Sequence, residues 1–90
     1  MLSISAYPNP INPRTTIRYT VPAKGPVSVD LFDARGGHVA TLFDGAREAG
    51  AFTLAWNAED DAGRRMSSGV YFARVTQAAQ TKSYKLVLLK

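Results

Sequence analysis

Apolar and polar positions alternate along about seven short stretches of the chain, which is typical of strands that bury one face. Glycine, proline and asparagine separate these stretches, and no segment keeps the period of a helix. The pattern predicts an all-β fold in which short turns join antiparallel strands. It favours a β-sandwich over a small closed barrel. The expected strands cover residues 2–7, 15–21, 27–33, 38–43, 51–57, 69–75 and 81–89.

The stretch from Gly69 to Val75 is predicted to be an interior strand, because valine and aromatic residues favour strands and both of its faces carry bulk. One face presents Tyr71, Ala73 and Val75, and the other presents Val70, Phe72 and Arg74. The stretch 81–89 is expected to be its hairpin partner, joined to it by a turn at 76–80. The single tryptophan, Trp56, is expected at the centre of the core.

The connections differ in kind. Three prolines at positions 8, 10 and 13 exclude a helix or a central strand, and they indicate an ordered, extended loop in which Asn9 and Asn12 close local turns. This loop and the polar segment 57–68 are expected to cross between the two sheets. The stretch 38–43 has irregular apolar spacing, which predicts a bulge or an edge strand, and 44–50 is expected to be a polar connection.

Composition and charge limit the possible functions. Ninety residues make one small domain, and the absence of cysteine excludes disulfides and thiolate metal sites. The net charge is +4, but the eleven Lys and Arg residues are scattered, and only Arg64 and Arg65 are adjacent. A basic domain without a basic run is more often simply soluble than a nucleic-acid binder. No nucleic-acid partner is expected.

Few residues could carry chemistry. His38, the only histidine, is expected at the surface beside the Gly36–Gly37 turn, without partners for a zinc site. An acidic cluster is a weak calcium candidate, but its spacing does not match a calcium loop, and turn closure around Gly63 is the favoured interpretation. No catalytic residue and no cofactor are expected. The members of that cluster are Asn57, Glu59, Asp60 and Asp61.

A carbohydrate-binding accessory module would need a row of exposed aromatic side chains. The candidates for such a row are Tyr7, Phe32, Phe43 and Phe72, and each of them also has an ordinary packing explanation. The sequence therefore favours a docking, anchoring or structural module over an enzyme.

Several motifs resemble one family of bacterial modules. Residues 7–19 read YPNPINPRTTIRY, 29–39 read VDLFDARGGHV, 56–57 read WN, 62–72 read AGRRMSSGVYF, and 85–90 read KLVLLK. In this order they resemble the C-terminal sorting domains of the type IX (Por) secretion system, which overlap in sequence with the Ig-like domain of the flagellar hook-capping protein. Ile11 stands where the family usually has Phe, and Gly37 where it often has Arg, Lys or Glu. The structural motif includes Pro8, Asn9, Pro10 and Trp56.

The resemblance implies an Ig-like β-sandwich, spanning 1–90, at the end of a larger secreted enzyme or adhesin. The module would be recognised by outer-membrane type IX components after export to the periplasm, and lipopolysaccharide of the cell surface is a further implied partner. The expected location is extracellular or on the cell surface. The residues expected to form the recognised hairpin are Gly69, Tyr71, Lys85, Leu86, Val87, Leu88, Leu89 and Lys90.

A physical basis for this recognition is strand addition to a terminal edge strand whose backbone groups are unpaired. Two other interpretations stay open. One is the alternative that the domain is a scaffold part of hook-capping type, and the other is that Leu86 and Leu88 have a purely structural role and only close the core.

Overall fold

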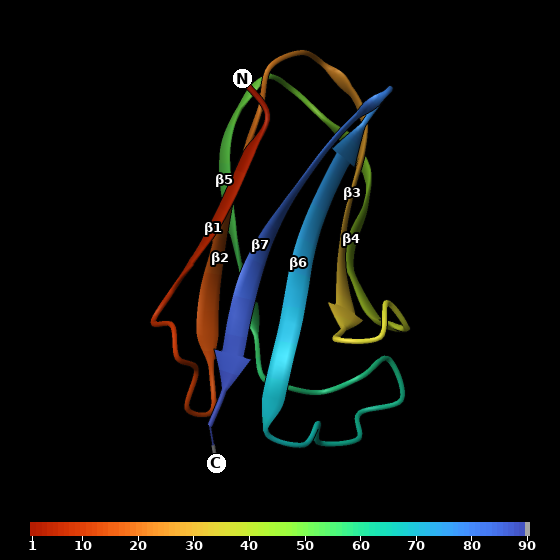
Figure 1. Ribbon diagram of the computed structural model, residues 1–90. Coiled ribbons are helices and arrows are strands. Elements are labelled where there is room, and N and C mark those ends of the chain that lie inside the picture. The colour runs from red at the N-terminus through yellow and green to blue at the C-terminus, as the bar shows by residue number, and fades with distance from the viewer. Residues whose placement is uncertain (90) are drawn as a thin grey trace.

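The computed structural model describes residues 1–89, which fold into seven strands without a helix (Figure 1). One sheet has the strand order β1-β2-β5 and the other has the order β4-β3-β6-β7, and every pair of neighbouring strands is antiparallel. The prediction of an Ig-like, all-β sandwich is confirmed. The strands are β1 Ser3–Tyr7, β2 Thr15–Val21, β3 Gly25–Asp33, β4 His38–Arg47, β5 Gly50–Trp56, β6 Gly69–Gln77 and β7 Gln80–Leu88.

Alternation along each strand builds the core between the two sheets. Successive side chains of a strand point to opposite faces, so one apolar residue in every two enters the space between the layers. As predicted, β6 is an interior strand, and its residues Tyr71, Ala73 and Val75 are buried. Each fully buried large side chain contributes about 1.5 to 3 kcal/mol of transfer free energy. The largest side chains with almost no exposure are Tyr19, Leu2, Ile11, Ile17, Leu31, Leu86, Leu88, Val29 and Val75.

Strand β4 is longer than the sequence indicates. It is the bulged edge strand that the irregular spacing predicts, with register shifts opposite Val29/Asp30 and Leu31/Phe32. The expected polar connection at 44–50 is wrong, because pairing with β3 resumes after the bulge and continues to Arg47. The guanidinium of Arg47 lies 4.1 Å from the ring centre of Phe43 and 4.6 Å from that of Phe52, which links the edge strands β4 and β5.

Two further expectations about connections are corrected. The proline-rich loop does not cross between sheets, because β1 and β2 are neighbours in one sheet and Tyr7 is opposite Thr16. The segment 57–68 does cross, from β5 to β6, as predicted. The turn between β6 and β7 is shorter than 76–80, since Gln77 pairs with Gln80 and only Ala78 and Ala79 remain.

Two buried tyrosines differ in whether the hydroxyl group has a hydrogen-bond partner, and this difference can be tested by unfolding. The hydroxyl of Tyr19 is buried without a hydrogen-bond partner in the described chain, whereas that of Tyr71 donates to the Ser67 carbonyl at 2.6 Å. We expect Tyr19→Phe to stabilise the domain by about 1 to 2 kcal/mol, and Tyr71→Phe to destabilise it by about 1 kcal/mol. Urea unfolding of the two variants measures both effects. Destabilisation of similar size in both would contradict the assignment.

Candidate functional site: the clamp on the terminal strand

The outer edge of β7 is hydrogen-bonded to the proline-rich loop. Asn9 Nδ2 donates to the Lys85 carbonyl at 3.0 Å, and Asn9 Oδ1 accepts from the Val87 N–H at 3.0 Å. The Ile11 N–H donates to the Val87 carbonyl at 2.7 Å, and the Leu89 N–H donates to the Ile11 carbonyl at 3.0 Å. The loop 8–13 and the segment 85–89 thus form one unit, which we call the terminal clamp; the two segments lie side by side in Figure 1.

The local geometry of the loop supports this arrangement. The side chain of Ile11 has no exposed surface and belongs to the hydrophobic core. The Thr15 hydroxyl donates to the Pro8 carbonyl at 2.9 Å, which ties the loop to the start of β2. The predicted turn closure by Asn9 is wrong, because both ends of its amide bond to β7 instead of to the loop itself. The Tyr7–Pro8, Asn9–Pro10 and Asn12–Pro13 peptide bonds are cis.

The expectation that the terminal strand has an unpaired edge, open to strand addition, is wrong for the segment 85–89. Backbone groups at Lys85, Val87 and Leu89 that were expected to be unpaired are occupied by Asn9 and Ile11. An incoming strand cannot pair with this part of the edge unless the clamp opens.

The residues proposed for recognition fall into two groups. Tyr71, Leu86 and Leu88 are buried in the core, so a partner protein cannot contact their side chains directly. Gly69, Lys85 and Leu89 are exposed, and Val87 is half-buried. Lys90 lies outside the described residues. Of the structural motif, Pro8, Asn9 and Pro10 are exposed on the loop, whereas Trp56 is buried, as expected.

The acidic segment after β5 closes turns. Asp60 Oδ1 accepts the N–H groups of Ala62 and Arg64, and Gly63 has a φ of 81°, a conformation that favours glycine. Asp61 Oδ1 accepts the Thr41 N–H at 3.0 Å. In residues 1–89, no group of three His, Cys, Asp or Glu side chains is arranged to hold a metal ion. The favoured interpretation of this segment, turn closure, is therefore confirmed for Asp60 and Gly63.

The pKa of Asp60 is lowered from its ordinary value of 3.8, mainly because its carboxylate accepts the Arg64 backbone N–H. Loss of hydration raises this pKa, whereas the Arg64 side chain and the Ala62 N–H lower it. A carboxyl group with a lower pKa in the folded state stabilises the fold above its unfolded pKa, and this contribution disappears as the pH falls through the folded value.

We therefore expect Asp60→Asn to be less stable than the parent protein at neutral pH. The difference in unfolding free energy between the two proteins is expected to become smaller as the pH falls below 3.8, the ordinary pKa of the Asp carboxyl group. Urea unfolding midpoints between about pH 6 and about pH 2 measure this change. Asp44→Asn, on β4, is the control for the change in net charge. Parallel pH profiles for the parent protein and Asp60→Asn would contradict the assignment.

The aromatic candidates do not form one exposed row. Tyr7 is 82% exposed, at the end of β1. Phe32 and Phe72 are paired on the other sheet and half-buried, and the Arg74 guanidinium lies 4.2 Å from the Phe32 ring centre. Phe43 is half-buried beneath Arg47. The row that a carbohydrate-binding module would need is therefore not present among these four residues.

The other candidate groups lie at the surface. His38 is exposed, as predicted, and its Nε2 lies 3.0 Å from Asp30 Oδ1.

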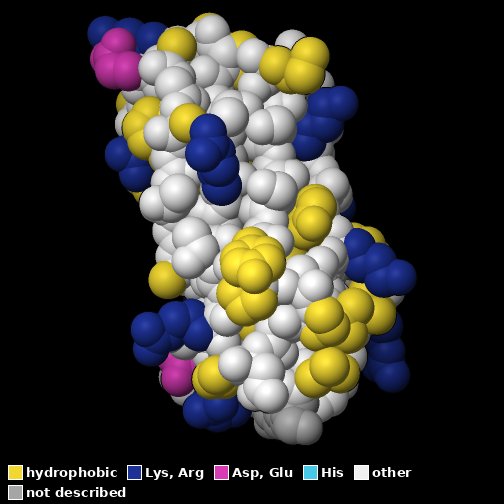
Figure 2. Space-filling model, turned by 90° about the vertical axis from the view of Figure 1, so that its left-hand side faces the viewer, with side chains coloured by type: hydrophobic (Ala, Val, Ile, Leu, Met, Phe, Trp, Pro, Cys, Tyr) yellow, Lys and Arg dark blue, Asp and Glu magenta, His cyan; other side chains and the backbone are white. Residues whose placement is uncertain are grey.

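Figure 2 shows that basic side chains are dispersed over one face of the molecule, where uncharged polar and backbone atoms predominate. Residues 1–89 contain no helix with the length and hydrophobicity that a membrane span requires.

The two antiparallel sheets and their strand order define an Ig-like domain. The model of the FlgD Ig-like domain family matches residues 13–81, and the chain belongs to this family. No curated protein matches the chain in sequence.

Solved structures from two systems resemble the domain. FlgD from Xanthomonas campestris, whose structure is described as giving insights into the hook capping essential for flagellar assembly, is 27% identical with a TM-score of 0.64, over 93% of this chain and 60% of that chain. FlgD from P. aeruginosa is 24% identical with a TM-score of 0.64, over 82% of this chain and 58% of that chain. The chain thus spans about three-fifths of these FlgD chains.

Two neighbours come from Porphyromonas gingivalis. Dimeric latent PorU is 18% identical with a TM-score of 0.76, over 99% of this chain and 9% of that chain. PorZ, described as a surface component of the type IX secretion system, is 24% identical with a TM-score of 0.61, over 97% of this chain and 11% of that chain. At these identities the similarity is one of fold.

Proposed function

We propose that the domain is a non-catalytic sorting or attachment module that directs a secreted parent protein through the type IX secretion machinery. The parent, an enzyme or adhesin, lies upstream, and residues 1–90 are its C-terminal domain. The partners are outer-membrane type IX components, and the site of action is the cell surface. Lipopolysaccharide is the proposed attachment partner there.

The observation that carries this proposal is the terminal clamp. The two motifs that open and close the family pattern, 7–13 and 85–90, are far apart in sequence, yet Asn9 and Ile11 bond to the backbone of β7. The clamp holds the segment 85–89 in one conformation, so its exposed side chains form a defined surface that a partner protein can recognise. The proposed contact surface comprises the exposed residues Gly69, Lys85 and Leu89, with the side of Val87 that remains accessible.

A secretion assay tests the proposal. The domain is fused behind a reporter with a signal peptide, in a host with a type IX system. We expect the intact fusion at the surface or in the medium, and the double variant Lys85→Ser/Leu89→Ser in the periplasm. Both side chains are exposed, so the variant is expected to fold, unlike a deletion of 85–90, which would remove Leu86 and Leu88 from the core.

The control is Lys24→Ser/Ala51→Ser, which changes two exposed residues elsewhere and is expected to be secreted. Circular dichroism establishes that all variants are folded. The proposal fails if the intact fusion stays in the periplasm, or if the Lys85/Leu89 variant is secreted as well as the control.

A structural role of hook-capping type is the second candidate function. It is favoured by the family match over residues 13–81 and by the likeness to two FlgD proteins. In this case the domain supports an assembly and carries no export signal. Periplasmic retention of the intact fusion, together with normal folding, is the result that this alternative predicts.

A further inference from the structure

The outer edge of β7 is open over its first half. In an antiparallel strand, the backbone groups of alternate residues point to the same side. The backbone groups of Lys85, Val87 and Leu89 point outward to the loop 8–13. Those of Thr81 and Ser83 therefore point to the same outer side of β7. No strand of residues 1–89 pairs with β7 on this side, although β1 of the other sheet lies near it, and the hydrogen bonds from the loop begin only at Lys85. The first half of β7 therefore presents an edge that a further strand can join.

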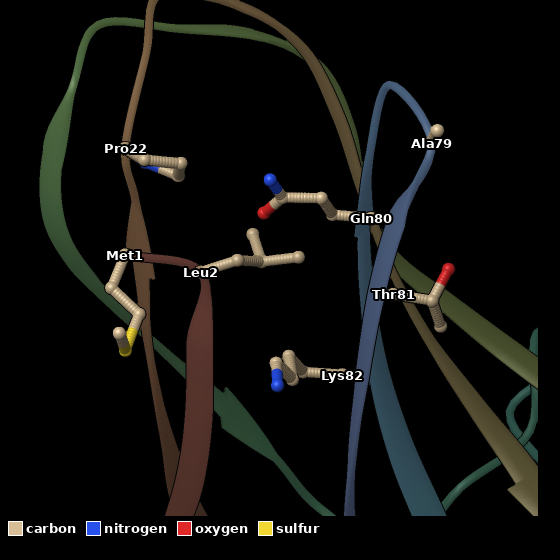
Figure 3. Close-up of a pocket in the computed structure, with 7 residues that line it drawn as sticks. All are labelled: Met1, Leu2, Pro22, Ala79, Gln80, Thr81 and Lys82. Carbon is tan, nitrogen blue, oxygen red and sulfur yellow. The ribbon is translucent and has the colours of Figure 1, made fainter.

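A groove of about 550 Å³ lies next to this open edge. It separates the beginning of β1 from the beginning of β7, which are the edge strands of the two sheets. Figure 3 shows Leu2 pointing into this space from one side, and Gln80 and Lys82 pointing into it from the other. The groove is lined by Met1, Leu2, Pro22, Ala79, Gln80, Thr81 and Lys82.

The lining selects the kind of strand that fits. Lys82 is the only charged side chain in it, and no carboxylate lines it. A lysine at an edge strand opposes pairing with a second copy of the same strand, because antiparallel self-pairing would bring two ammonium groups into one groove. An opposite charge on the incoming strand removes this repulsion, and the exposed side chains of Met1 and Pro22 offer contact to its apolar side chains.

We propose that the groove binds an extended, acidic segment of a partner protein by strand addition to Thr81 and Ser83. The segment carries a carboxylate beside Lys82 and apolar residues two positions before and after it, on the same face. This inference does not rest on the sorting function, since it applies equally to a scaffold domain. It assigns strand addition to the first half of β7, whereas the clamp closes the second half.

The probe is a synthetic peptide, acetyl-Thr-Val-Thr-Glu-Thr-Val-Thr-amide, with a matched peptide that has Lys in place of Glu. Titration of the isotopically labelled domain is followed by the NMR shifts and hydrogen exchange of its backbone amides. We expect the Glu peptide to shift the amides of residues 79–84 and to slow exchange at Thr81 and Ser83. The Lys peptide is expected to bind at least about tenfold more weakly.

Two variants make the test decisive. Ser83→Pro removes an outward N–H that β6 does not use, and proline is tolerated at such edge positions, so the variant is expected to fold and to lose binding. Lys82→Glu is expected to reverse the preference between the two peptides. The proposal is overturned if neither peptide shifts residues 79–84, or if Lys82→Glu leaves the preference unchanged. Dimerisation of the domain that Ser83→Pro abolishes would instead identify a second copy as the occupant.

Discussion

Replacing Ile11 by Ala is expected to destabilise the domain by about 2 to 5 kcal/mol, because a fully buried aliphatic side chain is removed from a packed core. For a small domain this is a large part of its total stability, which is typically about 5 to 15 kcal/mol. Ile11 also carries two of the backbone hydrogen bonds that close the edge of β7. Its loss is therefore expected to loosen the clamp as well as the core. Urea unfolding followed by circular dichroism measures the first effect.

Native-state hydrogen exchange separates the two effects. The Val87 and Leu89 amides donate to Asn9 and Ile11, so their exchange reports directly on opening of the clamp. Ile17→Ala is the matched control, since Ile17 is equally buried but lies in β2. We expect both variants to lose similar global stability. Only Ile11→Ala is expected to speed hydrogen exchange at the Val87 and Leu89 amides by more than the loss of global stability explains. Equally faster exchange at these amides in both variants would argue against a local clamp.

Much of the fold could be predicted from alternation alone, because the core faces of β2, β3 and β6 are apolar except for Thr15 and Gln77 at strand ends. The prediction failed where the pairing changes register. At the bulge near Val29 and Asp30 the apolar period of β4 breaks, so the continuation to Arg47 carries no strand signal of its own. The side chain that stabilises this end of the strand, Arg47, is polar by type and covers the rings of Phe43 and Phe52.

The candidate site was predicted in its parts but not as a unit. The motifs at 7–13 and 85–90 could be identified in the sequence, but Asn9 bonds to residues 76 and 78 positions away, and one sequence gives no indication of such a pairing. A local turn was the reasonable expectation for Asn9, and it would use the N–H two residues later. In the structure that N–H, of Ile11, bonds to Val87 instead. Long-range pairing thus replaces local turn closure.

The sole tryptophan is expected to be as important for stability as any residue in the chain. Trp56 is 3% exposed, its ring packs edge-on against Tyr71 with centroids 5.6 Å apart, and its Nε1 donates to the Glu59 carbonyl at 2.9 Å. It therefore joins the end of β5 to β6 and to the crossing segment 57–68. Trp56→Ala is expected to cost about 3 to 5 kcal/mol through the cavity and the lost contacts.

Trp56→Phe separates packing from hydrogen bonding. It keeps an aromatic ring in the core but leaves the Glu59 carbonyl without its donor, so we expect a smaller loss than for alanine, of about 1 to 3 kcal/mol. Because both variants remove the only tryptophan, unfolding must be followed by circular dichroism and not by indole fluorescence. A loss for Trp56→Phe as large as that for Trp56→Ala would mean that the link to the crossing segment, more than the buried ring, holds the two sheets together at this end.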